Sequence, residues 1–335
     1  MASRACTIAI VNEKGGCGKS TTAVNLGAGL ALAGFRTCLI DLDQQCNTTA
    51  NFAIDPDELP KEGKFSALDI YLQKKRAVDI QLPLPGRFDD RLTLVPGSRG
   101  LGSVHHRLEA TMQAELAAKA NSIIMADELR EEHRTRLKRS LGSLDGECDF
   151  VLLDTPGDLG FLVTTALIAA DFYMIPIFPS AYDLQGLDAL TASIHKVRDR
   201  LNPSLQFLGV LFGRVDGRTR LDADIKKNLR EHLGTDYVFE ASVSNSVKVR
   251  EAPIHAETIF EYDPRDTTAR QFTELTAEVA RKTGRAQPKA AEPVERVVEL
   301  TPAAAPEAPA EAPAEAPVEA QGLSEEPAAR EAGNG

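Results

Sequence analysis

The sequence predicts an α/β fold, namely a doubly wound, mostly parallel sheet with helices on both faces. Short apolar runs alternate along the chain with longer segments of helical periodicity, which is the pattern of repeated strand–helix–strand units. The apolar runs show no polar alternation, as expected for strands buried on both sides. A glycine-rich turn joins the first run to the first helix, and its residues are Lys14, Gly15, Gly16, Cys17, Gly18, Lys19, Ser20 and Thr21.

The expected elements follow from these runs and from the turn residues between them. Strands are expected at residues 6–11, 36–40, 92–95, 150–154, 172–177 and 206–212. Helices are expected at residues 22–33, 66–73, 108–144, 183–201, 222–233 and 267–283. The segment 108–144 is polar and its charges alternate in sign, so we expect a solvated pair of helices there. A partner-binding face is the alternative for that segment.

Composition divides the chain into a folded part and a tail. Residues 285–335 are mainly alanine, proline and glutamate, and from Gln287 onward ten glutamates face only Lys289, Arg296 and Arg330. Such a stretch buries too little apolar surface to offset the entropy of ordering, so we expect a disordered tail. Residues 1–284 would then form one domain. The residues from Gln287 onward carry −7 of the net charge of −11, which leaves a mildly acidic body.

Cysteine usage and hydropathy indicate a cytoplasmic protein without a membrane span. The five cysteines are an odd number and show no C-x-x-C spacing, which is typical of a reduced compartment and argues against a disulfide framework or a zinc site. The first residues lead directly into a strand and are too short for a signal peptide. No apolar run approaches the 18 residues that a membrane helix needs.

The glycine-rich turn has the chemistry of a phosphate-binding loop. It fits G-x-x-x-x-G-K-[ST] only if Asn12 or Glu13 replaces the first glycine. Its glycines let backbone N–H groups face a phosphate, and the helix that follows adds its partial positive charge. We expect Lys19 to reach the β- and γ-phosphates of ATP and the hydroxyl of Ser20 to bind Mg²⁺.

Carboxylates follow two of the expected strands at their carboxyl ends. Asp41 and Asp43 come after the run 36–40, and Asp154 ends the run 150–154. In a doubly wound sheet this edge also holds the phosphate loop, so we expect Asp154 to hold Mg²⁺ through a water. Gly157, in the turn that follows, could direct a backbone N–H toward a γ-phosphate. For Asp41 a strand-end cap and a functional role remain open.

On these residues the chain resembles the ParA/MinD family of P-loop ATPases, whose deviant Walker A motif is K-G-G-x-G-K-[ST], and within it the small Soj-like ParA proteins. The resemblance covers residues 6–284. In that family the early lysine crosses a dimer interface to the partner's ATP, which implies this role for Lys14. Asp43 matches the second acid of the D-x-D-P-Q-x-N motif, which binds near Mg²⁺ and orients the attacking water; Gln44 replaces the proline.

The resemblance also implies contacts with DNA phosphates. Arg218 matches the arginine of the family's G/A-R-T motif, and Lys248 matches the basic residue of its N-V-R-L-x-E-A-P motif. Neighbouring cations complete the expected surface, namely Arg220, Lys226, Lys227 and Arg250. Such contacts give weak, salt-sensitive binding without sequence readout. The family's Pro-Arg-Asn near the adenine is replaced here by Ser244-Asn245-Ser246, so the resemblance does not carry over the base contacts.

Together these features predict a slow, partner-stimulated ATPase that forms a homodimer with ATP and Mg²⁺. It would bind nucleoid DNA non-specifically and segregate a chromosome or plasmid with a ParB-like partner. One alternative is an orphan ParA- or MipZ-like ATPase that positions a protein cluster or a division regulator. Another is an iron–sulfur carrier or reductase of the nitrogenase-iron-protein type. That alternative needs cysteines across a dimer axis, and Cys148 is poorly placed for it.

Overall fold

In a computed structural model of the protein, described at residues 3–118, 123–179, 181–215 and 220–286, the sheet has eight strands. In chain order they are β1 (Cys6–Ile10), β2 (Thr37–Asp41), β3 (Leu82–Pro83), β4 (Leu92–Val95), β5 (Phe150–Asp154), β6 (Phe172–Ile177), β7 (Gln206–Val215) and β8 (Val238–Ser244). Their order across the sheet is β3-β4-β2-β5-β1-β6-β7-β8. Every neighbouring pair is parallel except β3 with β4. The predicted mostly parallel sheet is confirmed.

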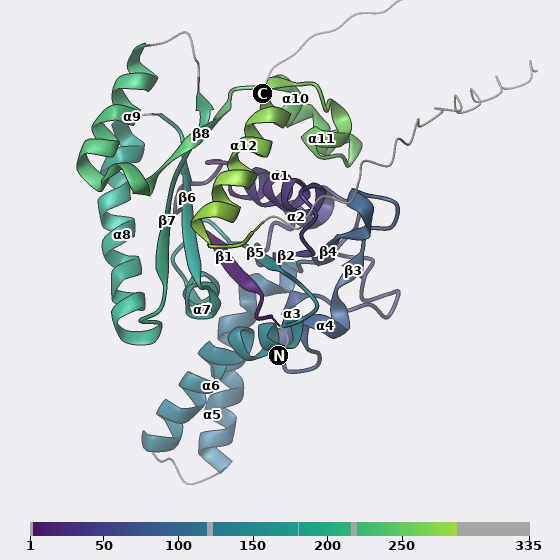
Figure 1. The fold of residues 1–335 in the computed structure, drawn as a ribbon. Coiled ribbons are helices and arrows are strands. Elements are labelled where there is room, and N and C mark those ends of the chain that lie inside the picture. Colours follow the sequence, from purple (N-terminus) through teal and green to yellow (C-terminus); the bar gives the residue numbers. More distant parts are fainter. Residues whose placement is uncertain (1–2, 119–122, 180, 216–219, 287–335) are drawn as a thin grey trace, which may run out of the picture. The chain divides into compact units, whose positions relative to one another are not determined.

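Helices lie on both sides of this sheet (Figure 1). In chain order they are α1 (Lys19–Leu32), α2 (Asn47–Ala50), α3 (Ala67–Tyr71), α4 (Ala77–Ile80), α5 (Val104–Ala118), α6 (Ile123–Leu141), α7 (Phe161–Ala169), α8 (Ala181–Leu201), α9 (Arg220–Leu233), α10 (Val247–Glu251), α11 (Ile259–Tyr262) and α12 (Thr267–Lys282). The sequence analysis did not predict β3, β8 or α7, nor the short helices α2, α4, α10 and α11. Helix α7 is buried almost throughout, so its sequence lacks the polar face that marks a surface helix.

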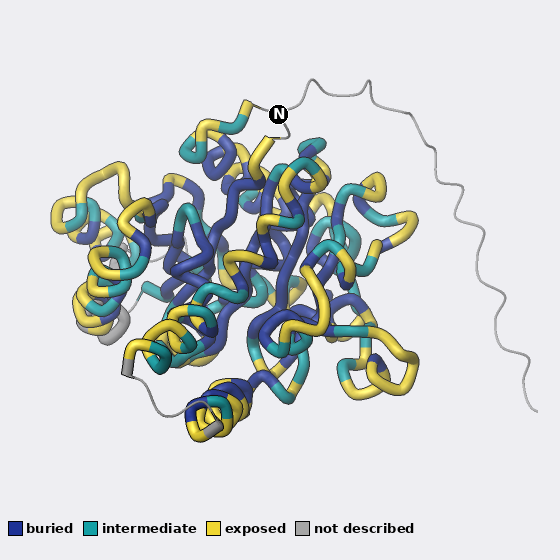
Figure 2. The backbone as a smooth tube through the Cα atoms, turned by 90° about the horizontal axis from the view of Figure 1, so that it is seen from below, coloured by how far each residue is buried: buried dark blue, intermediate teal, exposed yellow. Residues whose placement is uncertain are grey.

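Two cores sandwich the sheet because neighbouring residues of a strand point to opposite faces. In β1, Ile8 and Ile10 enter the core that α1 and α12 cover. Ala9 enters the other core, which α7 and α8 cover. Figure 2 shows the central strands dark blue along their length, with exposed residues on the outer helices. Since both faces are covered, binding chemistry is left to the strand ends.

The α5–α6 segment is less solvated than its sequence indicates. Helix α6 packs against α7 and α3, and it buries His133, Leu137 and Leu141. Three residues of α5 at four-residue spacing, Leu108, Met112 and Leu116, are buried as well. The expected solvated pair of helices is therefore wrong for the inner faces of both helices. Alternating charge on the outer faces masked a narrow apolar stripe.

The described residues end at 286, shortly after α12. The expected disordered tail lies almost entirely outside the described residues, so the division at residue 284 stays a prediction. None of the described helices is both long enough and apolar enough to cross a membrane.

Candidate functional site

The phosphate loop joins β1 to α1 at the carboxyl edge of the sheet. Gly16 and Gly18 have φ values of 73° and 94°, in the left-handed region that favours glycine. A Cβ at either position, or at Gly15, would meet no atom within 4 Å. Gly16 and Gly18 are therefore required by the turn and not by packing. The turn leaves open space in front of the first residues of α1, where a helix favours an anion.

Lys19 lies across the mouth of this loop. Its side chain is buried, and Nζ donates to the carbonyl oxygens of Asn12 at 3.0 Å and Lys14 at 3.3 Å. Glu13 stands where the first glycine of G-x-x-x-x-G-K-[ST] would be, and Asn12 beside it braces the loop. Its Nδ2 donates to the Pro176 carbonyl at 2.7 Å, and its Oδ1 accepts the Lys14 N–H at 3.0 Å. Lys14 itself is exposed at the outer rim of the loop.

Asp154 brings a buried carboxylate to the same edge. Its Oδ2 accepts a hydrogen bond of 2.7 Å from Thr48 Oγ1, at the start of α2. Its Oδ1 is buried without a hydrogen-bond partner among the described residues. Burial raises the pKa of Asp154 to about 6, and contacts with Ser20 and Thr48 act against that rise. A buried carboxylate oxygen left open beside a serine hydroxyl fits a divalent cation with oxygen ligands.

Asp41 and Asp43 take different positions although they are two residues apart. Asp43 is partly exposed and lines the cavity in front of the phosphate loop. Asp41 is fully buried, and its Oδ2 accepts from Thr49 Oγ1 at 2.6 Å and Thr49 N–H at 2.8 Å. Its Oδ1 accepts the Asp43 N–H at 3.1 Å. Asp41 therefore holds the turn that presents Asp43.

The turn after β5 lies against the phosphate loop. A Cβ on Gly157 would lie 3.5 Å from the Glu13 carbonyl oxygen and 3.6 Å from Lys19 Nζ. Thr155 Oγ1 fixes the start of the turn by donating to the Ile10 carbonyl at 2.7 Å. The Gly157 backbone is thus within reach of a ligand held by Lys19.

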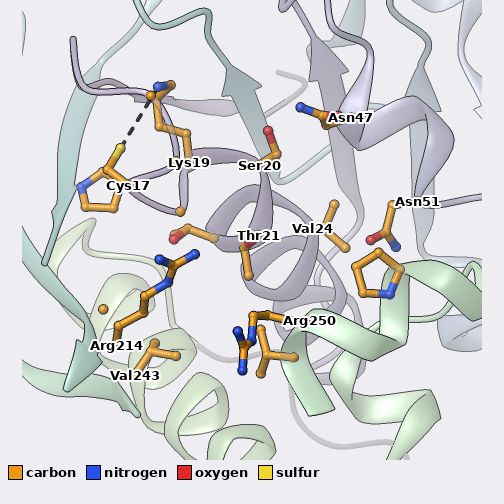
Figure 3. A pocket seen from close by; sticks show the side chains of 18 of the residues that line it. Cys17, Lys19, Ser20, Thr21, Val24, Asn47, Asn51, Arg214, Val243 and Arg250 are labelled. Atoms are coloured by element: carbon orange, nitrogen blue, oxygen red, sulfur yellow. Dashed lines mark hydrogen bonds between the residues drawn. The ribbon is translucent and has the colours of Figure 1, made fainter. Parts of the chain in front are cut away.

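A cavity of about 840 Å³ lies beside the phosphate loop and the first turns of α1 (Figure 3). Its volume lies in the range of small-molecule sites. Beyond the loop the lining has an apolar part, with Val24, Leu211, Val243, Val249 and Phe272, beside polar residues such as Asn51, Asn245 and Ser246. Ser244 also lines it, but Gln271 occupies both polar groups of Ser244: Oε1 accepts its N–H and Nε2 donates to its Oγ, each at 2.8 Å. Phosphate chemistry and an apolar slot therefore share one cavity.

The residues expected to contact DNA lie in different surroundings. Arg218 is outside the described residues, and Arg220 is the first residue of α9. Lys227 is exposed and forms a 3.9 Å ion pair with Glu231. Lys248 pairs with Asp263 and, at 3.5 Å, with Asp266.

Two of these residues differ from expectation. Lys226 Nζ donates to the Glu240 carbonyl and to Ser242 Oγ, both at 2.7 Å, so its ammonium is directed at β8 and not at the solvent. Burial lowers the pKa of Lys226 to about 8. Arg250 lines the cavity of the phosphate loop. The sequence analysis assigned no role to Asn12, Thr48 or Arg214, which also stand at this site.

Comparison with known proteins identifies the family of the chain. The profile of a family described as an AAA domain matches residues 5–207. The sporulation initiation inhibitor protein Soj of Bacillus subtilis is 32% identical over 273 residues, which are 82% of this chain and 97% of that protein. The chain belongs to the ParA/Soj family. The predicted family resemblance is confirmed.

Two further comparisons extend this ParA/Soj assignment. The chromosome partitioning protein ParA of Caulobacter vibrioides is 31% identical over 286 residues, which are 85% of this chain and 97% of that protein. A solved structure of cobyrinic acid a,c-diamide synthase from Mycobacterium smegmatis, with bound ADP and magnesium, is 26% identical with a TM-score of 0.61. That likeness covers 85% of this ParA/Soj-family chain and 98% of the other.

Proposed function

We propose that this protein is an ATPase that dimerises with ATP and Mg²⁺ and moves or positions a cargo on DNA. The observation that supports this proposal most strongly is the buried Oδ1 of Asp154, which has no hydrogen-bond partner among the described residues although its carboxylate lies beside Ser20 and Lys19 of the phosphate loop. The similar solved structure holds ADP and magnesium, which supports the same ligand class here.

The residues that would hold the nucleotide follow from the site. The N–H groups of the loop from Gly15 to Thr21 and the Lys19 ammonium bind the phosphates. Ser20, Asp43 and Asp154 supply the oxygens for Mg²⁺, the latter two partly through water. When bound, the cation neutralises phosphate charge. To bind a phosphate, Lys19 Nζ must give up its hydrogen bonds to the carbonyl oxygens of Asn12 and Lys14 and donate to phosphate oxygens instead.

Hydrolysis in this proposal rests on positioning and charge. Asp43 accepts a hydrogen bond from the attacking water and orients it, and Asp41 holds the Asp43 turn in place. Lys19 stabilises the negative charge that develops on the phosphate oxygens. Among the described residues that line the cavity, the carboxylates are Asp43 and Asp158 and there is no histidine, so turnover is slow without a partner.

Lys14 supplies the dimer contact. It is exposed at the rim of the loop, while Lys19 occupies the interior, so the two lysines are directed to different places. We propose that Lys14 binds the nucleotide of a second copy. ATP would then join the two subunits, and its hydrolysis would separate them.

DNA binding and a partner complete the proposal. Relatives are named for chromosome partitioning. We propose that the ATP-bound dimer binds nucleoid DNA through Arg218, Arg220, Lys227 and Lys248, and that a ParB-like or cargo protein stimulates hydrolysis. Lys248 already pairs with Asp263 and Asp266, so DNA must compete with those carboxylates. Such binding is weak and sensitive to salt.

Three single substitutions test the cycle. We expect Lys19→Ala to lose ATP binding, and Lys14→Ala to keep ATP binding but remain monomeric in light scattering. Asp43→Ala should bind ATP and dimerise but release phosphate at least about 100-fold more slowly. Lys138→Ala, an exposed lysine of α6, is the matched control. Phosphate release at the normal rate in Asp43→Ala, or an ATP-dependent dimer in Lys14→Ala, would contradict the proposal.

A further inference from the structure

Arg214, near the end of β7, faces the start of α1 across the cavity. It lines the same cavity as Lys19 and Thr21. Figure 3 shows its guanidinium directed toward Thr21, in the first turn of α1. The strand and the helix are far apart in sequence, so the fold brings this arginine to a phosphate loop that already holds its own lysine.

The backbone and a neighbouring ring hold Arg214 in this position. Its φ of 52° lies in the left-handed region, which is uncommon for a residue with a Cβ. A Cβ on Gly213 would lie 3.4 Å from a ring carbon of Phe178, so that ring packs closely beneath the turn. The Arg214 guanidinium lies over the same ring, 4.3 Å from its centroid. Stacking on an aromatic face orients the charge without neutralising it.

No carboxylate in the described ranges forms an ion pair with Arg214. Two other cations of the expected DNA surface are different, because Lys248 pairs with Asp263 and Lys226 donates to β8, and neither lines the cavity; Arg250 does line it. An oriented guanidinium directed into a cavity, without a protein counter-ion there, is suited to an anionic ligand. Phosphate is the natural one, since it accepts two parallel hydrogen bonds from one guanidinium.

The residue of α1 that Arg214 faces determines which phosphate the guanidinium can reach. In such a site the backbone N–H groups of the loop cradle the α- and β-phosphates, Lys19 reaches the β- and γ-phosphates, and the Ser20 hydroxyl binds Mg²⁺, so the α-phosphate lies nearest the residues that follow Ser20. Thr21 is the next residue along the helix, and beyond it Val24 belongs to the apolar slot. We infer that Arg214 binds the α-phosphate of the nucleotide, between the loop and the slot. This inference rests on the proposed nucleotide binding and adds a second cationic contact from β7.

Calorimetric titration of the full chain with a non-hydrolysable ATP analogue and with ADP tests this contact. Arg214→Ala should lower the affinity for both ligands by a similar factor, roughly tenfold, because both carry the α-phosphate. Arg214→Lys should recover part of the loss, since it restores charge but not the planar stacked group. Arg270→Ala, an exposed arginine of α12, is the matched control and should bind as the wild type does. Thermal melts of the ligand-free variants show whether a loss of affinity comes from the missing contact or from a destabilised fold.

Each outcome has one meaning. Unchanged affinity of Arg214→Ala for both ligands would overturn the inference. A lower affinity for the ATP analogue alone, with unchanged affinity for ADP, would also overturn the inference, because the contact would then be to the γ-phosphate. Failure of the wild-type protein to bind either ligand would instead refute the proposed nucleotide site.

Discussion

Two buried carboxylates, Asp41 and Asp154, stand opposite each other at the ends of β2 and β5. Asp41 is tied to Thr49, whose hydroxyl oxygen also accepts the Gly97 N–H at 2.7 Å, so the carboxylate organises three segments. Burial raises the pKa of Asp41 to about 7, and the charge of Asp154 adds to the rise. A site built this way favours protons or a cation.

Stability of the ligand-free protein should depend on the pH through Asp41. A carboxyl whose pKa is raised in the folded state stabilises the fold fully below its unfolded value, near pH 4, and that stability is lost as the pH rises to about 7. We therefore expect the melting temperature in EDTA to fall more between pH 5 and 8 in the wild type than in Asp41→Asn. Circular dichroism at four pH values measures both slopes. Equal slopes would show that Asp41 does not titrate in this range.

At the scale of elements, helix α9 separates two lysines that are adjacent in sequence. Lys226 bonds the β8 backbone, whereas Lys227 is exposed. Since β8 is the last strand in the sheet order, Lys226 is one of the contacts that attach α9 to that edge. The sequence places Lys226, Lys227 and Arg230 on neighbouring parts of a helix. That spacing does not show which of these side chains will contact the sheet.

Substituting the two lysines should separate fold from DNA binding. Lys226→Ala should lower the free energy of unfolding by about 1 kcal/mol and the melting temperature by about 2–4 °C. Lys227→Ala should melt as the wild type does but bind DNA more weakly, with a salt slope smaller by about 1. Thermal melts and DNA titrations at several salt concentrations, with the ATP analogue present, measure both. Normal DNA binding by Lys227→Ala would remove that residue from the DNA surface.

At the scale of the whole molecule, charge is distributed unevenly along the chain. Residues 287–335 contribute −7 of the net charge of −11. We propose that residues 1–284 are the ATPase domain and that 285–335 form a separate acidic tail. The tail would repel DNA phosphates and so weaken binding by the domain.

Truncation after residue 286 should leave the melting temperature and the ATP affinity unchanged. DNA binding with the ATP analogue should strengthen severalfold at low salt, and the gain should shrink as salt screens the charges. A full-length variant with the tail glutamates changed to glutamine should behave like the truncation, because the effect comes from charge. A lower melting temperature after truncation would instead place the tail within the folded domain.

The sequence by itself determined the local parts of this protein. The phosphate loop is contiguous in the sequence. Its glycines indicate a tight turn because of backbone sterics, and its lysines indicate an anionic ligand because of their charge. Strand runs were equally local, and Asp154 was found because it ends one of them. The family resemblance depended only on these short motifs, so it could be confirmed although the sequence analysis had missed elements such as β3, β8 and α7.

Only the tertiary structure decided which distant residues meet. Thr48 bonds Asp154 across 106 positions, Arg214 reaches α1 from β7, and α6 buries Leu137 against other helices. Such contacts depend on strand order and on how each helix crosses the sheet. Periodicity and turn chemistry act over a few residues, so they fix what each element is but not which element it will face.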